Sequence, residues 1–229
     1  MATVMITGAN RGIGLALARL YLARGDAVIG ACRKPREAGE LASLAGPSGK
    51  RAEISWIDVT NPLSIARTRD GLAGRAIDVL VNNAGIMPRE RQSVADMDFD
   101  GFLRVLDVNT IGPLRVTQAL LPNLEQARGK VANISSGMGS FSGGAAGDLA
   151  YRVSKAGLNK LSQGMAAELA PRGIAVVAIS PGWVRTEMGG AGAPLAVEAS
   201  AEGVAATIDG LTLAATGSFA NYDGRPIAW

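Results

Sequence analysis

The stretch Thr7-Gly8-Ala9-Asn10-Arg11-Gly12-Ile13-Gly14 decides which fold this sequence predicts. It follows a short run of β-forming residues, 3–7, and precedes an apolar helical pattern that ends at Gly25. Residues 27–31 form a second β-rich run, so the glycines lie between a strand and a helix of a βαβ unit. There, backbone without side chains can approach a pyrophosphate that also faces the helix N-terminus. Such a turn can be a simple chain reversal, but this context favours nucleotide binding.

Strands and helices alternate along the rest of the chain. The predicted strands cover residues 3–7, 27–31, 52–57, 77–81, 130–134, 174–179 and 217–222. The predicted helices cover residues 15–25, 36–44, 62–72, 97–124, 151–170 and 197–213. With no linker, repeat or low-complexity segment between them, we expect a single domain over residues 1–229. The fold class is α/β: a doubly wound, Rossmann-like parallel sheet with helices on both faces.

Composition excludes several classes of protein. Of the 229 residues, 48% are hydrophobic and 19% charged, which is typical of a globular chain. The net charge of +3 comes from scattered residues and gives no nucleic-acid footprint. With no histidine and one cysteine, the sequence excludes His- or Cys-based metal sites, Ser-His-Asp catalysis and an internal disulfide. No apolar run reaches membrane-spanning length, so we expect a soluble, cytoplasmic protein with no membrane contact.

Basic residues at the end of the second strand indicate which dinucleotide binds. NAD-specific folds carry an acidic residue about there, which holds the ribose 2′-hydroxyl. Here the sequence is Cys32-Arg33-Lys34. A guanidinium suits the additional phosphate of NADP, and Arg11 in the glycine turn favours the same cofactor. The alternative is that Arg33 and Lys34 are ordinary surface charges.

Tyr151 and Lys155 are spaced for proton transfer. On a helix, residues four apart lie on one face, so an ammonium group can lie beside the phenol. Lowering a tyrosine pKa from ~10 by three units needs roughly 4 kcal/mol. One cation ~4 Å away supplies about that much at an effective dielectric constant of ~20. The alternative is an ordinary amphipathic helix with a core tyrosine and a lysine that reaches solvent.

Polar and glycine residues follow several predicted strands, at the sheet edge where open α/β folds bind ligands. They are Asp58-Val59, Asn82-Asn83-Ala84-Gly85, Ser135-Ser136 and Ser180-Pro181-Gly182. Asn109 lies in the middle of a long helical stretch. An asparagine there usually bonds locally or bends the helix, and by itself indicates no catalysis.

These motifs together resemble the short-chain dehydrogenase/reductase family, collinearly over essentially the whole chain. The segments 181–190 and 221–226 resemble more narrowly its sniffer/C-factor branch of carbonyl reductases. The resemblance implies that Tyr151 is the general acid/base, that Lys155 lowers its pKa and holds the nicotinamide ribose, and that Ser136 binds the substrate oxygen. It also implies that Asn109 holds a water that links Lys155 to solvent.

The resemblance further implies the residues that bind NADP(H). Asn83 and Gly85 would contact the adenine and ribose side of the cofactor, Asp58 the adenine ring, and Thr186 the nicotinamide carboxamide. Position 180 is serine, where close relatives often carry histidine. The full expected set is Gly8, Asn10, Arg11, Gly12, Ile13, Gly14, Arg33, Asp58, Val59, Asn83, Ala84, Gly85, Tyr151, Lys155, Pro181, Gly182, Val184 and Thr186.

Two functions follow as hypotheses. The first is an NADPH-dependent oxidoreductase that reversibly reduces small aldehydes or ketones, with hydride from nicotinamide and a proton from Tyr151. The second is a nucleotide-binding signalling protein of the C-factor type, without required turnover. The set Asn109, Ser136, Tyr151 and Lys155 favours the enzyme, because a binding protein needs no proton donor.

We also expect a homodimer. The segment 97–124 and the Tyr151 helix carry more apolar residues than one core-facing stripe needs. Family members commonly dimerise through these two helices. In monomeric relatives, additional residues ahead of the tyrosine block this surface. Between Ser136 and Tyr151 this chain has two residues more than is common in the family, which are too few to do so.

Overall fold

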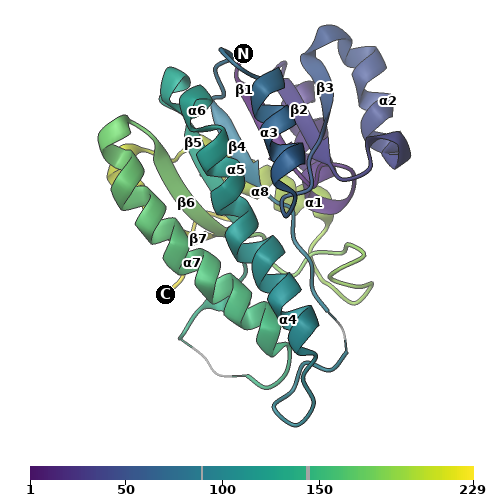
Figure 1. The fold of residues 1–229 in the computed structure, drawn as a ribbon, viewed down its shortest axis with the longest axis vertical. Helices are drawn as coiled ribbons and strands as arrows, with labels where there is room; N and C mark the ends of the chain where they lie inside the picture. Colours follow the sequence, from purple (N-terminus) through teal and green to yellow (C-terminus); the bar gives the residue numbers. More distant parts are fainter. Residues whose placement is uncertain (89, 143–144) are drawn as a thin grey trace.

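The computed structural model describes residues 1–88, 90–142 and 145–229. Within them, seven parallel strands form the central sheet, in the order β3-β2-β1-β4-β5-β6-β7 (Figure 1). The strands are β1 (Thr3–Thr7), β2 (Ala27–Cys32), β3 (Ala52–Trp56), β4 (Val79–Asn82), β5 (Lys130–Ile134), β6 (Ala175–Ser180) and β7 (Ser218–Asn221). The predicted doubly wound parallel sheet is confirmed.

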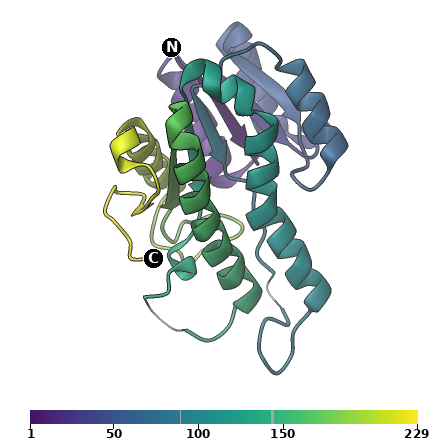
Figure 2. The same ribbon diagram turned by 60° about the vertical axis from the view of Figure 1, so that its left-hand side comes forward.

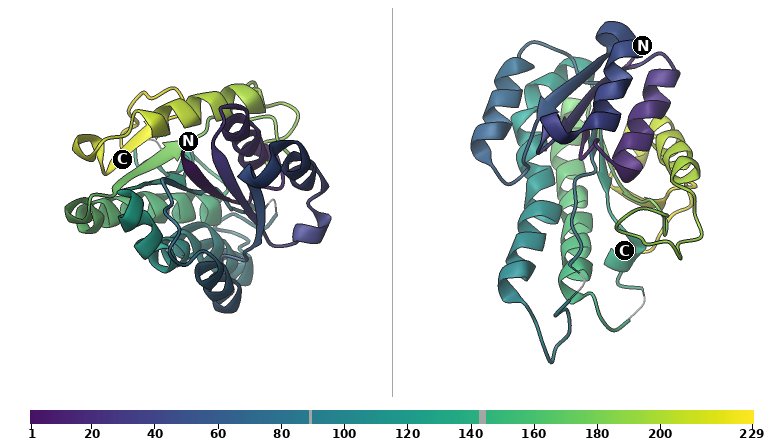
Figure 3. Two further views of the ribbon diagram at one scale, coloured as in Figure 1. Left: turned by 90° about the horizontal axis from the view of Figure 1, so that it is seen from above. Right: turned by 90° about the vertical axis from the view of Figure 1, so that its right-hand side faces the viewer.

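Helices cover both faces of this sheet, as the view from above in Figure 3 shows. One layer contains α1 (Gly12–Ala23), α2 (Gly39–Ser48) and α8 (Val197–Asp209). The other contains α3 (Pro62–Gly71), α4 (Phe99–Leu106), α5 (Gly112–Ala119), α6 (Leu121–Ala127) and α7 (Leu149–Leu169). No described helix combines the length and apolar character that a membrane span requires.

The strands bury side chains on both faces, which explains their continuous apolar runs. In β1, Val4 and Ile6 belong to the hydrophobic cluster beneath α1 and α8. Met5, between them, belongs to the cluster beneath α3, α5 and α7. All three are fully buried, so this short strand links the two halves of the core.

Four buried polar residues interrupt the apolar core between the sheet and helices α5 and α7. The Asn82 Nδ2 donates to Asn133 Oδ1 at 2.9 Å and to Thr117 Oγ1 at 3.1 Å. The Asn133 Nδ2 in turn donates to Ser162 Oγ at 2.9 Å. We call Asn82, Thr117, Asn133 and Ser162 the Asn82 cluster. It lies where Asn82 and Asn133 face each other in the register of β4 and β5.

The long helical stretch expected over residues 97–124, with an interruption at Gly112-Pro113, is divided into three helices and a π turn. Helix α4 passes into a π-helical turn, Asp107–Ile111, which α5 continues, and α6 follows after a bend. In the π turn the Gly112 N–H donates to the Asp107 carbonyl, five residues back. The next residue, Pro113, has no N–H to donate, so the turn lies where the regular helical ladder is already weak. Figure 2 shows α4 and α5 as one nearly continuous rod beside α7.

Several other helix boundaries also differ from the prediction, and two of them have a clear local cause. The helix expected from residue 36 begins at Gly39, because Pro35–Glu37 form a separate 3₁₀ turn. The helix expected to reach residue 213 ends at Asp209, with Gly210 as its C-cap. Both errors concern helix ends, where local turn chemistry outweighs the apolar pattern.

The strand order changes direction between β1 and β4, which are hydrogen-bonded neighbours. From β1 the chain continues to β2 and β3 on one side, and from β4 to β5, β6 and β7 on the other. Open α/β sheets bind ligands at the carboxyl ends of the strands at such a switch point. The glycine turn follows β1, and residues 83–85 follow β4, so both lie at this point.

Candidate active site

The predicted site residues collect along the carboxyl edge of the sheet. The glycine turn leads from β1 into α1, Arg33 follows β2, and Asp58 and Val59 follow β3. Ser136 follows β5, and the segment 181–186 follows β6. Tyr151 and Lys155 lie on α7, and Asn109 lies in the π turn.

The glycine turn has the geometry of an anion-binding site. Gly8 and Gly12 adopt φ angles of +67° and +54°, which favour glycine. A Cβ on Gly14 would lie 2.5 Å from the Asn83 Nδ2 and would also collide with the Gly8 carbonyl oxygen. No side chain caps the start of α1, and its first turn contains no acidic residue. The N–H groups there remain available to a phosphate.

Asn83 supports this turn from the neighbouring strand. Its Nδ2 donates to the carbonyl oxygens of Thr7 at 2.9 Å and Gly8 at 3.2 Å. The Thr7 Oγ1 accepts the N–H groups of Asn83 and Ala84, each at 3.0 Å. The Asn83 amide, which we expected beside adenine and ribose, is therefore engaged in shaping the turn. Thr7 was not predicted, although a hydroxyl directly before the first glycine was a visible signal.

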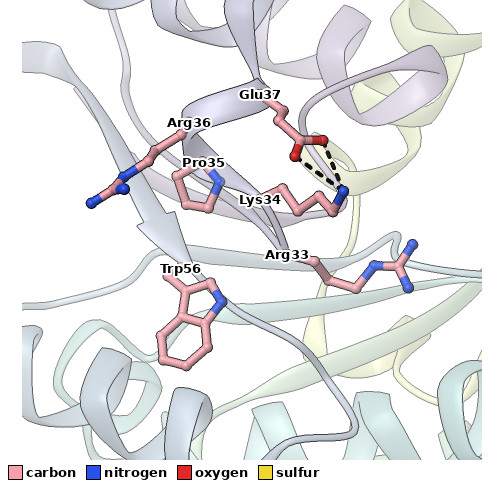
Figure 4. A pocket seen from close by; sticks show the side chains of 6 residues that line it. All are labelled: Arg33, Lys34, Pro35, Arg36, Glu37 and Trp56. Carbon is pink, nitrogen blue, oxygen red and sulfur yellow. Dashed lines mark hydrogen bonds and ion pairs between the residues drawn. The ribbon is translucent and has the colours of Figure 1, made fainter.

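A basic pocket lies at the end of β2 (Figure 4). Its cavity of about 380 Å³ is lined by Arg33, Lys34, Pro35, Arg36, Glu37 and Trp56. The Lys34 Nζ bonds both Glu37 carboxylate oxygens at 3.0 Å. Among the ion pairs of the described residues, none involves Arg33, whose side chain points away from the Lys34–Glu37 pair in Figure 4. Its guanidinium is free to meet an anion, while Cys32 is buried.

The loop after β6 comes close to the glycine turn. The Thr186 Cγ2 lies 3.5 Å from where a Gly12 Cβ would be, and the Arg11 guanidinium pairs with the Glu187 carboxylate. Both members of this pair are largely exposed. After β3, the Asp58 Oδ1 accepts the N–H of Thr60 at 2.9 Å and its hydroxyl at 2.7 Å.

Tyr151 and Ser136 meet across the gap between α7 and β5. Their side chains lie close to each other, and Tyr151 is only 8% exposed. Burial raises the pKa of the phenol to about 12, although the neighbouring Ser136 side chain lowers it. Tyr151 is thus protonated at neutral pH, the form that a proton donor requires.

Lys155 is buried beneath this pair. Its Nζ donates to the Ile134 carbonyl oxygen at 2.8 Å and lies 5.6 Å from the centre of the Tyr151 ring. Burial lowers the pKa of Lys155 to about 8, so the ammonium form predominates at pH 7. The expected lowering of the Tyr151 pKa is not seen here, because desolvation outweighs attraction to a cation at this distance.

Asn109 faces the same region from the π turn. Its Oδ1 accepts the Ile86 N–H and its Nδ2 donates to the Ile86 carbonyl, both at 2.8 Å. The Nδ2 also donates to Ser154 Oγ on α7 at 3.0 Å. A Cβ on Gly85 would lie 3.3 Å from the Asn109 Oδ1 and 3.7 Å from the Lys155 Nζ. The structure therefore brings together Asn109, Gly85, Lys155, Tyr151 and Ser136.

Two further polar side chains that the sequence analysis did not assign to the site hold the turn after Ser136. The Ser180 Oγ accepts the Gly137 N–H at 3.1 Å. The Asn159 Nδ2 donates to the Gly139 carbonyl at 3.2 Å. For Asn159 the signal was its place four residues after Lys155, on the same side of the helix.

Comparison with known proteins gives close matches to this arrangement. The family profile described as short chain dehydrogenase matches residues 2–193. The C-signal protein of Myxococcus xanthus is 41% identical over 155 residues, 67% of this chain and 93% of that protein. The solved structure of the carbonyl reductase Sniffer of D. melanogaster superposes with a TM-score of 0.94 at 33% identity, covering both chains completely. An NADPH-bound carbonyl reductase from chicken fatty liver gives 0.93 at 33% identity, covering 100% of this chain and 99% of that one.

Fold, site and sequence agree with one another. The family profile spans most of the chain, including the glycine turn, Asn109, Ser136, Tyr151 and Lys155. The two solved structures match this chain from end to end at identities above 30%. The chain belongs to the short chain dehydrogenase family.

Proposed function

We propose that this protein is an NADPH-dependent reductase of aldehydes and ketones, able to run in reverse as an alcohol dehydrogenase. The observation that carries the proposal is the Tyr151 phenol, close to the Ser136 side chain and above the buried ammonium group of Lys155. The names of two similar structures, which are carbonyl reductases, support it.

NADPH fits the carboxyl edge of the sheet. The glycine turn and the uncapped start of α1 would hold the pyrophosphate, and Arg33 would hold the 2′-phosphate. Arg11 would turn from Glu187 toward the same phosphate. Tyr151, Lys155 and Thr186 would hold the nicotinamide side. When bound, the cofactor supplies the hydride.

The protein's own groups manage the oxygen and the proton. In the proposed reaction the substrate carbonyl oxygen accepts hydrogen bonds from Ser136 and Tyr151. As negative charge develops on that oxygen, the phenol of Tyr151 donates its proton. The Lys155 ammonium group then stabilises the tyrosinate that remains. Asn109, bonded to Ile86 and Ser154, would hold the water that returns a proton from solvent.

The loop after β6 offers an apolar surface to the substrate. The Trp183 indole is 62% exposed, and its N–H donates to the Gly189 carbonyl at 2.9 Å. Arg185 donates to the carbonyl oxygens of Ala193 and Pro194 at 3.1 and 2.8 Å, which closes the loop on itself. A short, self-bonded loop leaves room for substrates of varied shape.

Turnover of NADPH with a panel of activated aldehydes and ketones tests the proposal. We expect carbonyl-dependent loss of NADPH absorbance, and no such loss for the Tyr151→Phe variant. If the protein binds NADPH tightly but reduces none of these carbonyls, the proposal is wrong.

One observation favours a second function, that of a nucleotide-binding signalling protein that needs no turnover. The relative of Myxococcus xanthus that is 41% identical carries the name C-signal. The same assay separates the two, because a signalling protein would bind NADPH without consuming it.

We further propose a homodimer formed by α4, α5 and α7. These helices expose Phe99 (72%), Leu103 (66%), Leu114 (39%) and Val153 (46%). A two-fold interface that covers them would bury well over ~1,200 Å². Light scattering should give twice the chain mass of 23.4 kDa, and Leu103→Glu should lower it to that of one chain. A wild-type mass of one chain contradicts the dimer.

A further inference from the structure

The hydroxyl of Ser136 belongs to a compact turn. The position of this turn relative to α7 decides how far the Ser136 hydroxyl lies from that of Tyr151. The Met138 N–H donates to Ser136 Oγ at 3.2 Å, and the Gly139 N–H donates to the Ser136 carbonyl at 2.9 Å. These internal hydrogen bonds hold the turn together as one unit. Because Tyr151 lies on α7, the contact between the two hydroxyls depends on how the turn is attached to that helix.

One side chain of α7 attaches both flanks of the turn. The Ser135 hydroxyl donates to Asn159 Oδ1 at 2.5 Å, directly before Ser136. The Asn159 Nδ2 donates to the Gly139 carbonyl at 3.2 Å, three residues after Ser136. Asn159 is only 2% exposed, so both bonds are shielded from water. Its carboxamide thus closes a bridge across the base of the turn.

The turn also contacts the helix backbone without an intervening side chain. A Cβ on Gly139 would lie 2.6 Å from the Lys155 carbonyl carbon and 2.8 Å from the Ala156 nitrogen. Tyr151, Lys155 and Asn159 follow one another at intervals of four residues along α7. They lie on the side of the helix that faces the end of β5. The Tyr151 hydroxyl and the bridging Asn159 side chain therefore lie on one helix, to which the turn that carries Ser136 is attached.

We propose that Asn159 is a positioning residue of the active site, which fixes the Ser136 hydroxyl relative to the Tyr151 hydroxyl. Its effect on turnover rests on the proposed reductase function, whereas its effect on the turn does not. The role requires a group that donates and accepts at once. Leucine, of similar size, does neither, and aspartate keeps only the acceptor.

The test compares Asn159→Leu with a matched control, Asn123→Leu. Asn123 is also buried, and its Nδ2 donates to the carbonyls of Leu72 and Arg75 at 2.6 and 2.7 Å. It lies near the start of β4, at the opposite edge of the sheet from Ser136. Both variants lose two hydrogen bonds of a buried side-chain amide. Only Asn159→Leu loses the bridge between Ser135 and Gly139.

Three measurements should separate positioning from general stability. Amide hydrogen exchange at residues 137–140 should become at least tenfold faster in Asn159→Leu and stay unchanged in Asn123→Leu. The kcat for carbonyl reduction should fall at least tenfold, because a displacement of ~1 Å can cost about 10²-fold. The Kd for NADPH should stay within threefold of the wild type, because the glycine turn and Arg33 are untouched.

Alcohol oxidation adds a pH readout, since there Tyr151 must act as a base. Displacement of the Ser136 side chain from Tyr151 removes an influence that lowers the pKa of Tyr151. The rising limb of the pH–rate profile should therefore move to higher pH in Asn159→Leu. Ser135→Ala, which leaves the Gly139 bond in place, should give smaller changes of the same kind.

The outcomes are distinguishable from those that test the proposed function. Unchanged exchange at residues 137–140 in Asn159→Leu overturns the positioning role, whatever the turnover. Equal acceleration there in Asn123→Leu overturns it too, because the effect would then be general loosening. Faster exchange confined to Asn159→Leu, in a protein whose wild type reduces no carbonyl, supports the positioning role and refutes the reductase.

Discussion

Replacing Lys155 with methionine should stabilise the protein at neutral pH while it removes activity. Lys155 is 5% exposed, and burial lowers its pKa from 10.5 to about 8. At ~1.36 kcal/mol per pH unit, this drop means that folding the ammonium form costs roughly 3 kcal/mol. Methionine keeps an apolar stem and has no charge to desolvate. The variant loses the 2.8 Å bond to the Ile134 carbonyl, and leaving that group unpaired costs roughly 1–3 kcal/mol.

The shifted pKa of Lys155 determines whether wild-type stability rises or falls with pH. The folded pKa of Lys155 lies below the unfolded value, so between about pH 8 and 10.5 the unfolded chain binds more protons. Wild-type stability therefore gains from Lys155 as the pH rises through this window, and the variant has no such gain. The variant should be more stable by up to about 2 kcal/mol at pH 7, the difference of the two costs above. This advantage should shrink and then change sign as the pH approaches 10.5.

Urea unfolding of both proteins without cofactor, from pH 6.5 to 10, measures this difference. Other titrating groups are common to both chains and cancel. Lys160→Met is the control, because Lys160 is an exposed lysine on the same helix. A stability difference between Lys155→Met and wild type that does not change with pH would refute the reasoning. Kinetics should show lower turnover and weaker NADPH binding in Lys155→Met, and loss of only one means that one role is misassigned.

Three more substitutions test other parts of the site. Tyr151→Phe should keep the fold and NADPH binding but lower kcat by ~10²-fold or more, since it removes only the proton donor; retention of a tenth of the wild-type kcat would contradict this. Cys32→Asp combined with Arg33→Ser should shift the ratio of kcat/KM values from NADPH toward NADH, and equal wild-type affinity for both cofactors would argue against the role of Arg33. Gly14→Ala should lower the unfolding free energy by about 1–3 kcal/mol and weaken NADPH binding, because the new Cβ meets backbone at Gly8. An unchanged melting temperature would show that the turn can relax.

The sheet was predictable from sequence because each strand is a short apolar run bounded by turn residues. β1 (Thr3–Thr7) and β5 (Lys130–Ile134) begin and end where the sequence predicts. Helix ends were less predictable. Nothing in an apolar pattern separates the 3₁₀ turn Pro35–Glu37 from the helix that begins at Gly39.

The site was predictable as a set of motifs but not as a set of contacts. Spacing placed Tyr151 and Lys155 on one helical face, yet it could not show that burial governs both of their pKa values. That depends on how much of the chain covers them. In the same way, the sequence could place Asn83 at the end of a strand, but which backbone carbonyls its amide reaches depends on the packing of β1 against β4.

The Asn82 cluster has a consequence for how the chain avoids misfolding. β4 and β5 are short and mostly apolar, so hydrophobic contact alone discriminates weakly between alternative alignments of the two strands. The Asn82 and Asn133 amides are hydrogen-bonded to each other in the native alignment, where Thr117 and Ser162 accept further bonds from them. A shift by two residues would place Asn82 opposite Val131 and leave the buried amides without hydrogen-bond partners. Each unpaired group would destabilise the misaligned sheet by roughly 1–3 kcal/mol. The cluster therefore favours the native alignment of β4 and β5 over misaligned pairings, which would leave its buried amides without partners.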